Sequence, residues 1–413
     1  MSSDIYSEHE RQKIAQAEYK NLKRKQKLRI TNDKGKKETI GTVREVVTNK
    51  TGLKAYVVES PDKKEVSVLY QGSVSPPGKG SKADWLDNDI PMAKNIIMKK
   101  KEATPQLKSA AAALNHVLAT YPKAKVTVYG HSLGSMNAQY ALANVSDVKR
   151  ISGAYVYEGP NVYPVLTGKQ KAKVAALKYR THNYIDPKDS VPLGYVKDTL
   201  NYKVDLNSEN AVGIVYHVDS KTVFNPIEQH MWGGYQWRSD GSLKIEKDSS
   251  ARESKYRSAL DSVALGMYHF PKLKAQREKG GLSGKEEFFL DSTQAAVVAS
   301  GLVKAAARVE KEVASAKKSA VEAAEILFNT TKTAPFMVTE LSPEEIQEAY
   351  AEAGVTYDSI VGKTERHFSK KVKQAEKIAQ AYTDLQGKIQ SGVEEAFAED
   401  AKLAGEFKQW SEK

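Results

Sequence analysis

Cysteine is absent from the 413 residues, so disulfide bonds, thiol nucleophiles and cysteine-ligated zinc are excluded. No stretch approaches the roughly 18 consecutive apolar positions that a membrane-spanning helix needs. Residues 1–30 are polar and contain no apolar core, so no secretory signal peptide is expected. This argues against export by the Sec pathway, but it leaves open a route that recognises a helical or folded signal.

The sequence also contains few features that would indicate a metal site or a nucleic-acid-binding site. The eight histidines show no HExxH-like spacing, so no catalytic metal or other cofactor is expected. A structural calcium site is not excluded by the sequence, because carboxylates are present in the predicted loops. No loop resembles that of an EF-hand. The net charge of +12 arises entirely from residues 1–260. Such a basic region favours anionic surfaces such as phospholipid, and no zinc-finger spacing or Walker loop indicates nucleic acid.

The chain contains two regions with different patterns of apolar residues. Up to about residue 245, short β-rich runs such as "EVSVLYQG" and "KVTVYG" alternate with helical ones, which predicts an α/β domain on a mostly parallel sheet. Beyond residue 285, apolar residues recur every three or four positions in two long stretches, which predicts an all-α hairpin or narrow bundle. The expected organisation is an α/β domain over 1–274, a linker over 275–287 and a helical domain over 288–413.

Ser132 stands between Gly130 and Gly134, where a β-like run meets a helical one. A G-x-S-x-G sequence at a strand-to-helix turn is typical of a nucleophile elbow, whose small flanking residues expose the serine hydroxyl. The N–H of Leu133 would then point to where an oxyanion forms. A glycine-rich turn without catalysis is the alternative.

A nucleophilic serine also needs a base and an orienting acid, which in α/β-hydrolases follow it in the order acid, then histidine. Asp186 and Asp189 lie in "HNYIDPKDSVPLG", where a predicted strand runs into a loop. His230 lies in a loop beside glycines and tryptophans, whereas His217 alternates with apolar residues and is expected within a strand. The residues favour His230 as the base and leave both aspartates open.

Four short motifs occur in a specific order around this serine. "YQGS" (70–73) ends a predicted strand and "DWLDND" (84–89) follows a Pro/Gly/Ser-rich stretch. "VYEGPNVYP" (156–164) and "DSVP" (189–192) come after the serine. Together they resemble the class 3 (fungal-type) lipase family over most of residues 60–235. The resemblance implies an α/β-hydrolase fold and serine ester hydrolysis.

The resemblance makes Ser132 the nucleophile, Asp189 the orienting acid and His230 the base. Ser73 and Leu133 would supply the N–H groups of the oxyanion hole. The spacing also permits Asp186 as the acid.

Residues 74–92 would form a lid that carries Trp85 and Ile90 as apolar contacts for substrate. Gln71 departs from the family, which usually has an arginine in this strand motif. The lid and the basic charge favour membrane phospholipid as the substrate.

The chain as a whole resembles the type VII-secreted lipase toxins of staphylococci, in which an LXG-like helical targeting domain follows the lipase domain. This implies secretion without a Sec signal, small helical partner proteins on residues 288–413, and an immunity protein. Two other functions stay open: an intracellular carboxylesterase with a helical oligomerisation tail, and a degenerate hydrolase that acts as a binding module.

Overall fold

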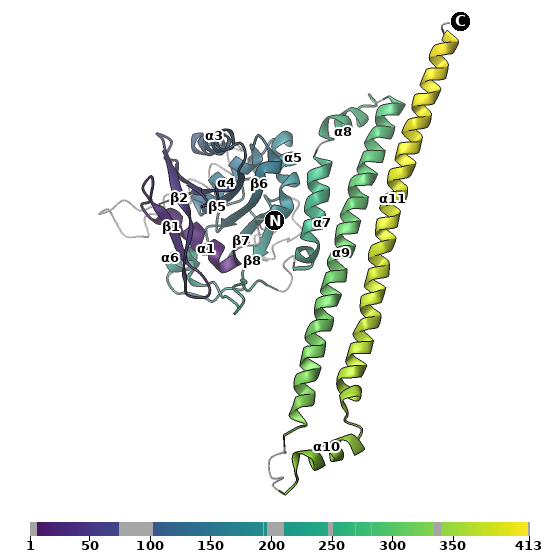
Figure 1. Ribbon diagram of the computed structural model, residues 1–413. Coiled ribbons are helices and arrows are strands. Elements are labelled where there is room, and N and C mark those ends of the chain that lie inside the picture. The colour runs from purple at the N-terminus through teal and green to yellow at the C-terminus, as the bar shows by residue number, and fades with distance from the viewer. Residues whose placement is uncertain are drawn as a thin grey trace. The chain divides into compact units, whose positions relative to one another are not determined.

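The computed structural model describes residues 6–73, 102–192, 194–195, 210–246, 251–268, 270–281, 283–333 and 340–411. The chain divides into two compact units, Met1–Pro271 (unit 1) and Lys272–Lys413 (unit 2). The strands lie in unit 1, and the two long helices α9 (Gly284–Thr330) and α11 (Lys363–Ser411) lie in unit 2 (Figure 1).

Unit 1 is built on one eight-stranded sheet whose strands lie in chain order. The pairs from β1 to β4 are antiparallel, and the pairs from β4 to β8 are parallel. The strands are β1 (Lys27–Thr31), β2 (Lys37–Thr48), β3 (Lys54–Glu59), β4 (Glu65–Tyr70), β5 (Lys125–His131), β6 (Ile151–Tyr157), β7 (Thr181–Ile185) and β8 (Ile214–His217).

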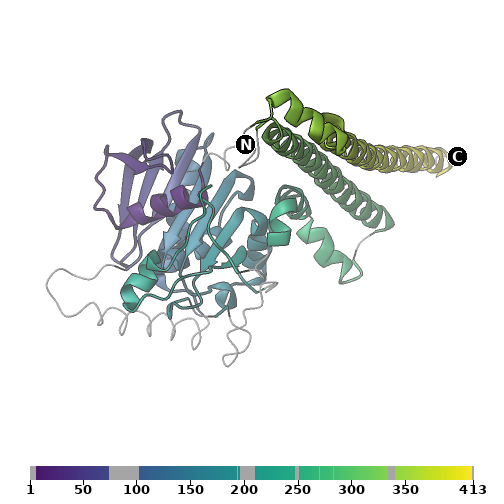
Figure 2. The same cartoon turned by 90° about the horizontal axis from the view of Figure 1, so that it is seen from below.

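Helices cover both faces of this sheet (Figure 2). Consecutive parallel strands joined by right-handed crossovers place their helices on one face. Val126 and Val128 of β5 accordingly cluster with side chains of α3 and α4, whereas Tyr129, next along the strand, clusters with α1 on the other face. The helices of unit 1 are α1 (Glu8–Gln16), η1 (Ala17–Tyr19), α3 (Pro105–Thr120), α4 (Leu133–Ala143), η3 (Val148–Arg150), η4 (Tyr163–Val165), α5 (Gly168–Ala176), η5 (Lys178–Arg180), α6 (Pro226–Glu228), η6 (Gln229–Gly233) and α7 (Ala251–Met267).

Unit 2 is an antiparallel pair of long helices, α9 (Gly284–Thr330) and α11 (Lys363–Ser411). Phe289 near the start of α9 contacts Phe397 near the end of α11, with ring centroids 6.3 Å apart. The shorter elements are α8 (Pro271–Arg277), α10 (Pro343–Glu352) and η7 (Asp358–Gly362). The predicted α/β domain followed by an all-α hairpin is therefore confirmed. Within the described ranges, no helix is both long and apolar enough to cross a membrane.

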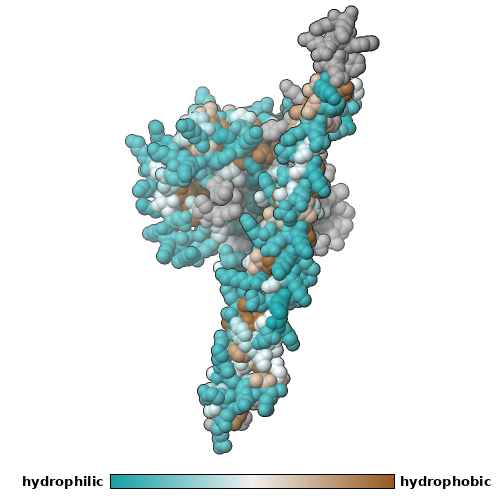
Figure 3. Space-filling model, turned by 45° about the vertical axis from the view of Figure 1, so that its right-hand side comes forward, coloured by the Kyte–Doolittle hydropathy of each residue, from teal (hydrophilic) through white to brown (hydrophobic). Residues whose placement is uncertain are grey.

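Two details of unit 2 differ from the expectation. The segment expected as a linker, 275–287, holds the end of α8 and the start of α9. Not every residue of the apolar repeat is packed, because Leu302 and Leu327 of α9 are exposed, whereas Ala306 and Ala324 are buried. A two-helix contact buries only a narrow stripe, and small alanines let the helices approach closely there. Figure 3 shows hydrophobic patches scattered among hydrophilic ones along this unit.

Candidate active site

Ser132 occupies a sharp turn between β5 and α4. Its φ of 56° and ψ of −126° lie outside the regions that non-glycine residues prefer, so the packing around it must hold it there. Both flanking glycines are sterically required. A Cβ on Gly130 would lie 2.3 Å from the Gly134 carbonyl oxygen, and one on Gly134 would lie 2.1 Å from the Tyr70 carbonyl oxygen. The turn is a nucleophile elbow in its geometry as well as in its sequence.

His230 and Asp189 form a buried hydrogen-bonded pair. His230 Nδ1 lies 2.6 Å from Asp189 Oδ2, and both side chains are almost completely inaccessible to solvent. The second carboxylate oxygen, Asp189 Oδ1, accepts a 3.0 Å bond from the Val191 N–H. A carboxylate on Nδ1 holds the proton on that nitrogen, so Nε2 is the nitrogen that can act as a base.

His131 connects this pair to the elbow. Its ring lies against the His230 ring, with centroids 4.6 Å apart, and its Nε2 lies 2.8 Å from the His230 carbonyl oxygen. Since Ser132 follows His131 directly, these contacts link His230 to the residue that precedes the serine. Asp189 follows β7 and His230 follows β8, so the carboxyl ends of parallel strands bring these residues to one edge of the sheet.

Asp186, the other candidate acid, has a different set of partners. Its carboxylate accepts 2.5 Å bonds from Ser220 Oγ and Gln229 Nε2 and a 2.9 Å bond from the Lys188 N–H. These bonds brace the loop that leads to the histidine. The structure therefore places Asp189 on His230 and gives Asp186 a supporting position.

The two expected oxyanion donors lie on segments that touch. A Cβ on Gly72 would lie 2.8 Å from the His131 carbonyl oxygen, so the end of β4 runs against the elbow immediately before Ser73. Leu133 is the first residue of α4, where N–H groups have no partner within the helix. The expected lid residues Trp85 and Ile90 lie outside the described residues.

Two buried acids of the site were not predicted. Glu158 follows β6 with a φ of 47°; its carboxylate accepts from the Asp186 N–H at 2.8 Å and from the Tyr235 hydroxyl. Burial, together with the nearby Asp189 and Asp186, raises the pKa of Glu158 well above its usual value. The signal for it was present, because "VYEGP" puts an acid at the end of a predicted strand.

Glu18 is the second missed acid, and its carboxylate accepts from the Gly72 and His131 N–H groups. Glu18 is fully buried, but no sequence motif surrounds it. Its place in the site therefore could not be predicted from the neighbouring residues. Among the residues that the structure describes, no group of three or more His, Asp or Glu side chains is arranged to hold a metal ion.

Comparison with known proteins found one family model and several solved lipase structures that are similar to parts of this chain. The family described as Mbeg1-like matches residues 88–239. A triacylglycerol lipase from Penicillium expansum is similar at 15% identity, with 60% of this chain and 83% of that chain covered and a TM-score of 0.31. Lip2 lipase from Yarrowia lipolytica is similar at 12% identity, with 51% and 72% covered and a TM-score of 0.29.

Rhizomucor miehei lipase in complex with its propeptide is similar at 17% identity, with 43% of this chain and 57% of that chain covered and a TM-score of 0.25. No curated protein sequence matches the chain. The strand order, the elbow and the positions of the histidine and aspartate at the carboxyl ends of strands give unit 1 an α/β-hydrolase fold.

Proposed function

We propose that this protein is a serine carboxylic-ester hydrolase that cleaves acyl esters of membrane phospholipids. The observation that carries the proposal is the bonded sequence of groups from Asp189 through His230 to His131, the residue next to the strained Ser132. Such an arrangement has a defined chemical use, because a serine, an imidazole and a carboxylate in this order perform acyl transfer.

The reaction proceeds in two halves. Ser132 Oγ attacks the ester carbonyl while His230 takes its proton, and the tetrahedral oxyanion accepts hydrogen bonds from the Ser73 and Leu133 N–H groups. The C–O bond to the alcohol then breaks, and the imidazolium gives its proton to that alcohol. Water, deprotonated by His230, hydrolyses the acyl-serine to a fatty acid and restores the serine. Asp189 stabilises the imidazolium throughout.

Phe224 supports a lipid substrate. This residue is fully exposed to solvent and precedes His230 by six positions on the same loop and helix. An exposed aromatic side chain on the segment that leads to His230 suits insertion into an acyl layer, and the excess of basic residues in unit 1 suits an anionic headgroup surface. The lid with Trp85 and Ile90 stays part of this proposal.

The biological setting is proposed from the chain's resemblance to staphylococcal lipase toxins. The protein would leave the cell by type VII secretion, with small helical proteins bound to the LXG-like unit 2 and an immunity protein neutralising it. Exposed apolar side chains on α9 and α11 offer surface for such partners: Val298, Leu302, Ile326, Leu327, Ile378 and Leu385.

The test compares the full chain with its Ser132→Ala variant. Fatty-acid release from phospholipid vesicles is expected to fall by at least about 10³-fold, with an unchanged circular dichroism spectrum. A fluorophosphonate probe should label the wild type and not the variant. Full activity of Ser132→Ala would refute the proposal.

The substrate is decided by a second comparison. Turnover of a soluble short-chain ester without vesicle hydrolysis would indicate an esterase for soluble substrates. Failure of the probe to label the wild type would indicate a binding module. Lipidomics of membranes exposed to each form would identify the ester bond that is cut.

A further inference from the structure

The segment just after α1 lies directly beneath the elbow. Glu18, in η1, is fully buried, and its Oε1 accepts two backbone hydrogen bonds. One comes from the Gly72 N–H at 3.2 Å and the other from the His131 N–H at 3.1 Å. A single carboxylate oxygen therefore joins the ends of β4 and β5.

The two N–H groups belong to the segments that carry the oxyanion donors. Gly72 directly precedes Ser73, and His131 lies two positions before Leu133. Gln71 strengthens the same junction, because its Nε2 donates a 2.5 Å bond to the Glu18 carbonyl oxygen. The spacing between the two donors thus depends on Glu18 and its immediate surroundings.

Tyr19 extends this contact to the base. Its hydroxyl lies 2.6 Å from His131 Nδ1, and the His131 Nε2 N–H donates to the His230 carbonyl oxygen. A neutral imidazole has one donor and one acceptor nitrogen, so Tyr19 is the donor at Nδ1. Burial, with a contribution from His230, lowers the pKa of His131 well below its usual value, in agreement with a neutral ring.

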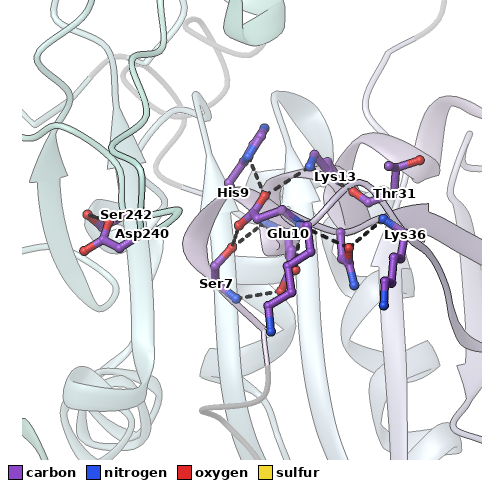
Figure 4. Close-up of polar contacts among 11 residues, drawn as sticks. Ser7, His9, Glu10, Lys13, Thr31, Lys36, Asp240 and Ser242 are labelled. Atoms are coloured by element: carbon purple, nitrogen blue, oxygen red, sulfur yellow. Dashed lines mark hydrogen bonds and ion pairs between the residues drawn. The ribbon is translucent and has the colours of Figure 1, made fainter.

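The far end of the N-terminal segment is held independently of the site (Figure 4). Lys13 Nζ donates to the Thr31 carbonyl oxygen at 2.9 Å and lies 3.2 Å from Asp33 Oδ1. His9 Nδ1 lies 2.7 Å from the same carboxylate, and Ser7 and Glu10 form a capping box at the start of α1. The fold therefore presents Glu18 from a segment that is already anchored on the β1–β2 turn.

We propose that Glu18 is a positioning residue, which holds the end of β4 and the nucleophile elbow together so that the Ser73 and Leu133 N–H groups converge on the oxyanion. The inference rests on the proposed ester hydrolysis. Preorganised donors of this kind supply much of the rate enhancement of acyl transfer, and misplacing them lowers kcat more than it changes substrate binding.

The role belongs to the acceptor atom and not to a negative charge. Burial raises the pKa of the Glu18 carboxyl well above its usual value, against the opposing effect of the two N–H bonds. The second oxygen, Oε2, makes no hydrogen bond with any part of the described chain. A glutamine at this position would keep the oxygen that accepts both bonds and place its NH₂ group where Oε2 lies.

The experiment measures kcat and KM of the full-length protein on a soluble ester, p-nitrophenyl butyrate. Glu18→Ala should lower kcat about 30- to 100-fold with KM within about 3-fold, because the oxyanion donors lose their alignment. Glu18→Gln should stay within about 3-fold of the wild type. A wild-type kcat in folded Glu18→Ala, or a Glu18→Gln variant as slow as Glu18→Ala, would overturn the proposal.

Glu8→Ala is the matched control. Glu8 lies on the same N-terminal segment and accepts bonds from the Tyr184 hydroxyl at 2.8 Å and the Leu243 N–H at 2.7 Å, away from the elbow. Its loss should lower the melting temperature without changing kcat. An equal fall in kcat for Glu8→Ala and Glu18→Ala would mean that general loosening of the segment is the cause, and would overturn the proposal.

Two further readouts keep the result interpretable. If Glu18→Ala does not fold, Glu18→Met, which fills the space without an oxygen acceptor, carries the same expected fall in kcat. Fluorophosphonate labelling of wild type and Ser132→Ala tests the proposed ester hydrolysis separately from the role of Glu18. Labelling confined to the wild type, together with an unaffected Glu18→Ala, would reject the role of Glu18 alone.

Discussion

At the scale of single residues, three carboxyl groups crowd the carboxyl end of the parallel strands, and they have different tasks. Asp189 holds the imidazole of His230, and Asp186 braces the loop before it. Glu158 accepts the Asp186 N–H and completes the cluster. Burial raises the pKa of both Glu158 and Asp186, and it is their different hydrogen-bond partners that distinguish the tasks of the three groups.

Substitution of the two aspartates by asparagine should therefore have different effects. Asp189→Asn removes the charge that fixes the His230 tautomer, and kcat should fall by about 10³-fold or more with little change in stability. Asp186→Asn replaces one acceptor oxygen by an NH₂ group, which then faces the donor group of Ser220 or Gln229 and cannot accept its hydrogen bond. This should lower the free energy of unfolding by about 1–3 kcal/mol.

Ester turnover and urea denaturation of both variants check this assignment. The Asp186→Asn variant is the matched control and should keep kcat within about 10-fold of the wild type. The reverse pattern, with Asp186→Asn inactive and Asp189→Asn active, would mean that the acid has been assigned to the wrong residue.

At the scale of elements, the segment between β8 and η6 is firmly held although it exposes an aromatic side chain. Gln229 Oε1 accepts the Val223 N–H at 2.6 Å, and the Lys221 N–H donates to the Gly234 carbonyl oxygen at 2.7 Å. Asn225 caps α6 through the Ile227 N–H at 3.0 Å. These bonds hold the residues on both sides of Phe224 while its ring stays in solvent. The ring is therefore exposed on a loop that is itself fixed by hydrogen bonds.

Phe224→Ser should reduce hydrolysis of anionic phospholipid vesicles by about 10- to 150-fold, because burial of a phenylalanine side chain in an apolar layer stabilises binding by about 1.5–3 kcal/mol. Turnover of a soluble ester should be unchanged. Vesicle sedimentation with Ser132→Ala, with and without Phe224→Ser, measures the binding separately from the chemistry. Ile326→Ser, on the exposed surface of α9, is the control; an equal effect of both substitutions would contradict a specific contact by the loop.

The elements themselves were predictable to different degrees. Ser342, Pro343 and Glu345 are typical of a helix start, and α10 begins there with Ser342 as N-cap and a capping box to Glu345. The run 174–185 is less uniform, because α5 and η5 take its first half and β7 only its second. Strands β1 and β2 were not predicted. In β1, buried residues alternate with exposed ones, and many residues of β2 are only half-buried. Both strands contain many charged and polar residues, so their hydrophobic pattern is too weak to predict a strand.

At the scale of the whole molecule, unit 1 buries a histidine that the mechanism does not use. His217 is expected within a strand and lies at the end of β8, 3% exposed, with no described partner for its Nε2. Burial lowers the pKa of His217 to about 4. The unfolded chain therefore takes up a proton first as the pH falls, and stability is lost from pH 6.5 down to about 4.

A His217→Leu variant isolates this contribution, because all other titrating groups are shared with the wild type. Relative to the variant, the wild type should lose about 1.4 kcal/mol of unfolding free energy per pH unit between about pH 6.5 and 4. Urea denaturation followed by tryptophan fluorescence at pH 7, 6, 5 and 4.5 measures the difference. A difference that stays constant with pH would show that His217 titrates equally in the folded and unfolded chain.

The sequence by itself determined the features that depend on neighbours in the chain. The glycines around Ser132 and the caps of α10 each act over a few residues, so their consequences could be read locally. The order of the motifs also predicted which strand ends would meet, since parallel strands present their carboxyl ends at one edge.

Only the tertiary structure decided which groups became partners. Asp186 and Asp189 are three positions apart and chemically alike, and packing of the loop before His230 assigns the imidazole to one of them. Glu18 reaches residues 54 and 113 positions away. Such pairs form because burial requires each polar group to find a hydrogen-bond partner, and the partner is supplied by whichever segment the fold brings alongside.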